Sequence, residues 1–199
     1  MEAYSAVLLS LATIATAWCA FQASQWDGEQ AFLLNAASAE GRQSSLWTSL
    51  ASQRGMLDGI IFMNYVGAVA AGDDSLAAFY QDRFRPALKV AVDAWLATSP
   101  LRDPAAPPHP FVMPEYRLAE DSVASFHATE STLRTAEARE VDRHSDVYVL
   151  LTVFFASVLF FGGIATKFSS PPARKGILAV GTLVFLVAVG TLLTLPIML

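Results

Sequence analysis

Three uncharged stretches of at least 20 residues constrain this chain more than any other feature of its sequence. They are residues 3–24, 147–166 and 177–199, and none of them contains Asp, Glu, Lys, Arg or His. About 20 helical residues cross the roughly 30 Å hydrocarbon core of a bilayer. We therefore expect an all-α membrane protein with three transmembrane helices, at residues 1–24, 147–166 and 177–199.

The first stretch is predicted to be a retained anchor. A cleaved signal peptide has an apolar core of about 7–15 residues behind a basic segment, and neither property is found here. The stretch contains Cys19, the chain's one cysteine, preceded by Trp18 rather than by the small residue typical of a lipoprotein. We interpret Cys19 as a packing residue.

Basic residues between the last two stretches predict the orientation in the membrane. Residues 167–176 carry Lys167, Arg174 and Lys175 and no acid, so the positive-inside rule places this loop in the cytoplasm. The N-terminus is then cytoplasmic, whereas residues 25–146 and the C-terminus are periplasmic. The net charge of −5 and the absence of a basic stripe argue against a nucleic-acid partner.

The external domain, residues 25–146, is expected to be a helical bundle continuous with the first and second spans. No turn signal ends the first helix after residue 24. A second helix is expected over residues 75–98, with Asp73 or Asp74 as its cap and a kink or restart at Pro86. The bundle can bury its apolar faces only against its own helices or another copy.

Six of the ten prolines lie within residues 99–114, which predicts an extended, polyproline-like strap. Pro114 fits the first turn of a third helix over residues 115–146. Its apolar side is expected to comprise Tyr116, Ala119, Val123, Phe126 and Leu133.

Residues 56–72 could alter this topology because they carry a single charge, Asp58. If they crossed the bilayer, the basic loop would lie outside. Their length of 17 residues, with Asn64 and several glycines, favours a buried helix in the external domain.

A stripe of small residues follows the first span at alternating steps of four and three. Small side chains let helix backbones approach closely in lipid, so this stripe is a candidate helix-packing interface. It packs either against the chain's own spans or against another copy or a partner subunit. Its members are Ala6, Ser10, Thr13, Ala17, Ala20 and Ser24.

Polar and aromatic residues follow at the outer end of the same helix, largely on one face. We interpret them as interfacial anchors and interhelical hydrogen-bonding groups, with an ion or ligand site around Glu29 as the alternative. The cluster comprises Trp18, Gln22, Gln25, Trp26, Glu29 and Gln30.

The same helix carries residues 12–18 (ATIATAW), Phe21-Gln22-Ala23-Ser24, Trp26 and Gly28-Glu29-Gln30, and further along the chain are Phe79-Tyr80, Arg83-Phe84, residues 91–95 and 113–116, and a loop that begins with Thr166-Lys167. Together these residues resemble a signature of uncharacterised bacterial inner-membrane proteins. It spans nearly the whole chain. It implies an N-terminal span and a C-terminal transmembrane hairpin around a helical domain, and no activity or functional residue that could be transferred.

Acids and histidines gather on the third helix at Glu137, Glu140, Asp142, His144 and Asp146, below His127 and Glu130. Glu140 and His144 could share a cation, which is the only indication of an enzyme. A carboxylate-bridged metal site would repeat Glu-x-x-His on two helices, and interleaved arginines favour solvated i,i+4 pairs instead. We expect no catalytic residues, no metal and no cofactor.

The sequence contains no phosphate loop, G-x-S-x-G or H-E-x-x-H motif. We therefore predict a non-enzymatic structural or accessory subunit in the bacterial inner membrane. Its partners would be the lipid bilayer and either further copies of itself or a larger membrane complex. The alternatives are a homo-oligomeric channel, with Ser10, Thr13 and Gln22 along its axis, and a periplasmic ligand sensor.

Overall fold

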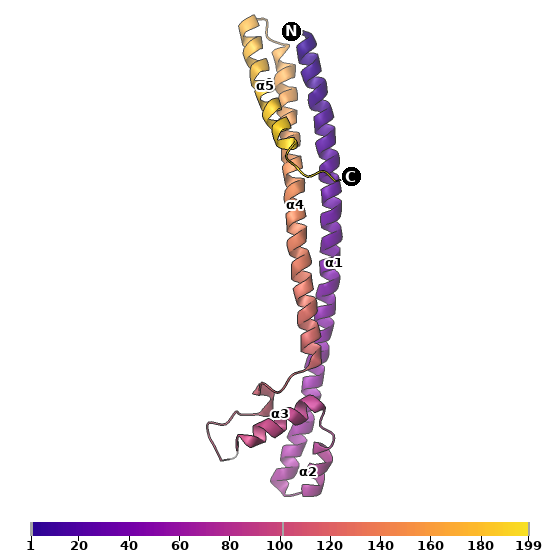
Figure 1. The fold of residues 1–199 in the computed structure, drawn as a ribbon, viewed down its shortest axis with the longest axis vertical. Coiled ribbons are helices and arrows are strands. Elements are labelled where there is room, and N and C mark those ends of the chain that lie inside the picture. The colour runs from indigo at the N-terminus through magenta and orange to yellow at the C-terminus, as the bar shows by residue number, and fades with distance from the viewer. Residues whose placement is uncertain (1, 101, 199) are drawn as a thin grey trace. The chain divides into compact units, whose positions relative to one another are not determined.

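A computed structural model describes residues 2–100 and 102–198, and these form helices, turns and no strand. The predicted all-α class is therefore confirmed. Figure 1 shows the order of the helices: α1 (Glu2–Ala71), α2 (Asp74–Gln81), α3 (Pro86–Ala97), the short 3-10 helix η1 (Pro110–Val112), α4 (Ala119–Ala165) and α5 (Pro171–Leu192).

Three of these helices, α1, α4 and α5, are long and apolar enough to cross a membrane. They contain the first uncharged stretch, all but the last residue of the second, and residues 177–192 of the third. By length and composition the chain is thus an integral membrane protein with three spanning helices.

Helix α1 continues without interruption from the first span into the following polar sequence, as expected. It contains no proline. It ends where Gly72 adopts a φ of +72°, and the amide of Asp73 donates to the carbonyl of Ala68. A left-handed glycine just after the last turn is a common helix C-cap because it carries no Cβ to clash.

Residues 56–71 form the last part of α1, and the prediction of a buried helix over residues 56–72 is right for only one face of this segment. Phe62 and Ala68 are buried, whereas Met56 and Met63 are more than 60% exposed. The helix packs on one side only, so its other apolar side remains uncovered.

The expected second helix restarts at proline. Helix α2 begins after Asp73, whose Oδ1 accepts from the amide of Leu76 at 2.9 Å, as predicted for the cap. Helix α2 ends at Gln81, and after residues 82–85 the chain begins α3 at Pro86, because a proline at the first helical position needs no hydrogen-bond acceptor for its nitrogen.

The third helix is predicted to begin at Pro114 or the next residue, but in the structure it begins at Ala119. The chain instead turns at residues 113–116, where the amide of Tyr116 donates to the carbonyl of Met113. The predicted apolar side is wrong as well, because Phe126 and Leu133 are more than half exposed. The row that packs inward on this stretch of α4 contains Glu120, Ala124 and Ala138.

The predicted basic loop is shorter in the structure. Helix α5 begins at Pro171, so Arg174 and Lys175 belong to its first turns. It ends at Leu192, and residues 193–198 continue as a non-helical tail rather than as the end of the span.

The chain divides into two compact units, residues 1–37 with 132–199 and residues 38–131, which we call the membrane unit and the middle unit. In the membrane unit, Leu8, Ala12, Tyr148, Phe155 and Ala188 belong to one buried cluster. In the middle unit, Phe62 packs on Leu88 and Val92, with Trp95 and Phe111 edge-on to its ring. Each unit therefore has its own core.

Candidate functional site

The small-residue stripe of α1 lies on the free surface of the membrane unit. All six residues, Ala6, Ser10, Thr13, Ala17, Ala20 and Ser24, are exposed. The hydroxyls of Ser10 and Thr13 donate to the carbonyls of Ala6 and Leu9 within the helix, at 2.9 Å each. The stripe therefore presents no unmet hydroxyl donor at these two positions and would tolerate a lipid or protein neighbour.

Another face of α1 packs against the chain's own spans. Ser5, Leu8, Ala12, Cys19 and Ala23 are buried there. At 3.6 residues per turn this face lies roughly 120° around the helix from the stripe. The stripe is therefore not packed against the chain's own spans, which was one of its two predicted uses.

The polar and aromatic cluster divides between two sides of α1. Trp18, Gln25 and Glu29 are exposed, and Trp18 packs obliquely on Phe21. Gln22 is fully buried, and Trp26 and Gln30 are half-buried. The structure therefore does not bring the six residues together at one point.

Gln22 binds the tail that follows α5. Its Nε2 donates to the carbonyl of Met198 at 2.9 Å, and its Oε1 accepts from the amide of Met198 at 3.0 Å. Tyr148 on α4 donates to the carbonyl of Pro196 at 3.0 Å. The buried amide thus has the partners that its desolvation requires, supplied by a tail backbone.

Just beyond Gln22, α1 and α4 exchange polar contacts. The ring of Trp26 packs on His144 with centroids 4.8 Å apart. The hydroxyl of Ser145 contacts Oδ1 of Asp27 at 2.5 Å and the carbonyl of Ala23 at 3.3 Å. The sequence analysis missed Asp27 and Ser145, although a serine and an aspartate at the ends of two adjoining spans were a usable signal.

The middle unit contains a buried carboxylate that the sequence analysis mentioned only as a lone charge. Asp58 is 1% exposed. Nε and Nη2 of Arg85 donate to its two oxygens at 2.9 and 2.7 Å, and the hydroxyl of Tyr116 donates to Oδ2 at 2.9 Å. This fork geometry is the strong form of a charge-assisted pair.

A second ion pair continues this network. Arg54 binds Glu120, which is 5% exposed, and the carbonyl of Arg54 accepts from Nη2 of Arg85 at 2.6 Å. Burial, followed by the hydrogen bond to Asp58 and the charge of Asp58, raises the pKa of Tyr116 well above its usual range. Tyr116 therefore stays protonated and acts as a donor, and the network joins α1, α3 and α4 through satisfied contacts.

Two acids of the acid and histidine set on α4 form ion pairs with arginines. Arg134 pairs with Glu137 and Arg143 with Glu140, at i,i+3 rather than the predicted i,i+4 spacing. His127 contacts Glu40 at 2.6 Å, and His144 lies on Trp26. Within residues 2–100 and 102–198, no three His, Cys, Asp or Glu side chains are grouped so that they could hold a metal.

Comparison with protein-family models, curated proteins and solved structures found no match to this chain. The resemblance to bacterial inner-membrane proteins therefore stays a prediction from the sequence.

Proposed function

We propose that this chain is a non-enzymatic structural or accessory subunit of the bacterial inner membrane, which docks through α1 to another copy of itself or to a larger membrane complex. The observation that carries the proposal is the exposure of all six residues of the small-residue stripe. The chain's own spans cover another face of α1, so close approach along the stripe is left to a helix from outside the chain.

The physical basis is the way in which helices associate in lipid. Lipid tails are as apolar as leucine, so close van der Waals packing rather than the hydrophobic effect holds spans together. Alanines and serines at alternating steps of four and three give a shallow surface on which a second backbone can lie. Large exposed residues on the neighbouring face, such as Ile14 at 67% exposed, fit contact with acyl chains instead.

A second stripe on α1 supports docking through the middle unit. Met56, Ile60, Met63, Gly67 and Ala70 also follow steps of four and three, and all are exposed. The one charge in this segment, Asp58, is turned inward to Arg85. Such an uncharged apolar stripe on a water-facing helix is typical of a helix–helix interface.

The proposed orientation places the N-terminus in the cytoplasm and the middle unit and the C-terminal tail in the periplasm. It rests on Lys167, Arg174 and Lys175, which lie at or near the turn between α4 and α5, where no acid occurs.

The ion pairs of Glu137 and Glu140 with arginines favour a structural role for the acids of α4.

A photo-crosslinking amino acid placed at single positions in native membranes tests the docking. At Ala17, on the stripe, we expect an adduct after irradiation, with twice the chain's mass for self-association or a larger mass for a partner. Ile14, equally within the span but off the stripe, is the matched control and should give only lipid adducts. The absence of a protein adduct from Ala17, or equal adducts from both positions, would overturn the proposal.

A further inference from the structure

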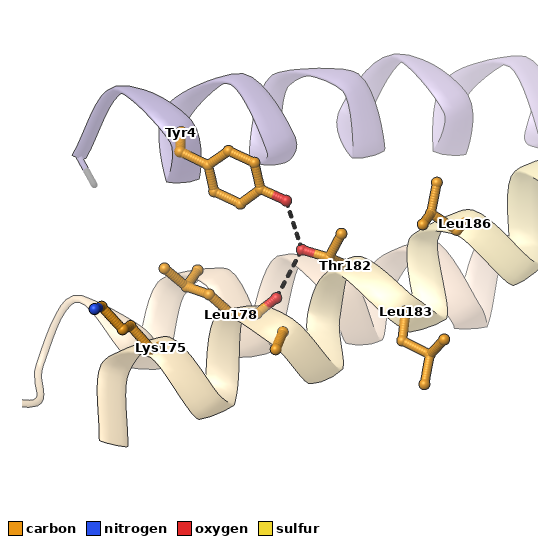
Figure 2. A pocket seen from close by; sticks show the side chains of 7 residues that line it. Tyr4, Lys175, Leu178, Thr182, Leu183 and Leu186 are labelled. Carbon is orange, nitrogen blue, oxygen red and sulfur yellow. Dashed lines mark hydrogen bonds between the residues drawn. The ribbon is translucent and has the colours of Figure 1, made fainter. Parts of the chain in front are cut away.

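An open groove in the membrane unit runs along α5 beside the first turns of α1. Its volume is about 510 Å³, within the usual range for small-ligand sites. Figure 2 shows its lining: Leu178, Leu183 and Leu186 project from α5, Tyr4 comes from α1, and Lys175 stands at one end. We propose that this groove binds an anionic glycerophospholipid, with one acyl chain along α5 and the phosphate at Lys175.

The groove has the length of one leaflet. Lys175 and Leu186 are eleven residues apart, which corresponds to about 16 Å along a helix. Half of the hydrocarbon core of a bilayer is about 15 Å. Leu183 and Leu186 are 64% and 60% exposed, so an acyl chain lying here buries apolar side chains that the rest of the chain leaves open.

A hydrogen bond joins Tyr4 and Thr182, two of the residues that line the groove. The hydroxyl of Thr182 donates its single proton to the carbonyl of Leu178 at 2.7 Å. The 2.7 Å contact between Tyr4 and Thr182 must therefore be donated by Tyr4 (Figure 2). Both donors are satisfied inside the chain, so the floor of the groove makes no demand for water and suits an acyl chain.

Charge at the open end selects the headgroup. Lys175 lines the groove, and the preceding Arg174 buries an Nε atom that has no hydrogen-bond partner among the described residues. Residues 147–199 contain no Asp or Glu, and the first 26 residues contain only Glu2. Basic residues at the end of a span, next to an apolar groove, attract lipids whose phosphate-containing headgroup has a net negative charge.

The test is lipid retention by the purified full-length chain. The protein is equilibrated in detergent with equimolar phosphatidylglycerol and phosphatidylcholine of identical acyl chains, and the bound lipids are counted by native mass spectrometry. One lysine near an anionic lipid is worth about a fivefold preference. We therefore expect about fivefold more phosphatidylglycerol than phosphatidylcholine on the unaltered chain.

Three variants separate the groove from general charge. Lys175→Gln should lower the ratio clearly below fivefold because Arg174 alone remains beside the groove, whereas Lys167→Gln, which removes an exposed lysine outside the groove, should leave it unchanged. Ala179→Phe keeps every charge but fills the groove wall, and should lower retention of the anionic lipid several-fold. Ala179 is exposed, so this variant tests the site even if Lys175→Gln does not fold.

Equal retention of both lipids by the unaltered chain would overturn the inference. So would equal effects of Lys175→Gln and Lys167→Gln, or unchanged retention in Ala179→Phe. The groove lies on α5 rather than on the stripe of α1, so its failure and the failure of docking are independent results.

Discussion

The membrane unit and the middle unit bury their polar groups in different ways. In the membrane unit the buried amide of Gln22 and the hydroxyl of Tyr148 bind backbone atoms of Met198 and Pro196, and all of these groups are neutral. In the middle unit the buried polar centre is ionic, with Asp58 held by Arg85. An ion pair is affordable where one partner still reaches water, and Arg85 keeps 34% of its side chain exposed.

The apolar packing of the two units differs as well. In the membrane unit α4 approaches α1 so closely that a Cβ on Gly162 would lie 2.5 Å from Cδ2 of Leu9. In the middle unit the core is a group of aromatic rings in edge-on contact around Phe62. Helices in lipid gain from close approach, whereas a domain in water gains from burying large apolar surfaces.

The largest effect is expected from breaking the ionic centre. Asp58→Ala leaves Arg85 partly buried without its carboxylate, and should lower the free energy of opening of the middle unit by about 3 kcal/mol. Hydrogen exchange of residues 38–131 in the full chain measures this. Asp93→Ala, at an exposed position on α3, is the control and should change little. A loss below about 1 kcal/mol for Asp58→Ala would show that the pair does not hold the unit together.

A smaller effect is expected from filling the close approach in the membrane unit. Gly162→Ala forces Leu9 to move and should cost about 1 kcal/mol relative to Gly163→Ala. Nothing lies within 4 Å of a Cβ on Gly163, so that variant carries only the change in helix propensity. Thermal unfolding in detergent compares the two. Equal melting temperatures would mean that the contact between α1 and α4 is looser than described.

The smallest effect concerns pH. The pKa of Tyr116 is raised in the folded chain, so the unfolded chain loses the proton first, near pH 10. The contribution of Tyr116 to the stability of the middle unit is therefore fully present below about pH 10 and is lost as the pH rises further. A fully buried group would lower the free energy of unfolding by about 1.4 kcal/mol per pH unit. Because Tyr116 is partly exposed, we expect a smaller decrease.

Denaturant unfolding between pH 8 and 11 measures this slope. Tyr116→Phe should flatten it, whereas Tyr80→Phe, on α2 and away from Asp58, should not. An unchanged slope in Tyr116→Phe would assign the alkaline loss to other groups.

Local signals predicted much of the fold. The uncharged stretches indicated the three spans, Asp73 indicated a cap, and Pro86 a restart. The start of α4 could not be predicted in this way, because the turn at residues 113–116 brings Tyr116 to a carboxylate 58 positions away in the sequence. A favourable proline at the first helical position carries less energy than that tertiary contact.

The candidate interface was predictable as a pattern but not as a face. Along the first span, another row of residues follows the same alternating steps as the small-residue stripe, so spacing alone could not decide which of the two packs within the chain. This row is Ser5, Leu8, Ala12, Ala15, Cys19, Gln22 and Trp26. It contains larger side chains that interlock with α4 and α5, and the smaller row is left outside. Asp58 was visible as a lone charge in an apolar segment, but its partners lie on other helices.

The clasp between Gln22 and Met198 also orders events during membrane insertion. The two residues are 176 positions apart, so the first span enters the bilayer long before the backbone that satisfies its buried amide has been synthesised. Until α5 has crossed and its tail has turned back, that amide has no tail to bind in the hydrocarbon. Closure of the hairpin therefore gives this amide its hydrogen-bond partners and removes the cost of burying it unpaired, which favours completion of the three-helix assembly over release of a half-inserted chain.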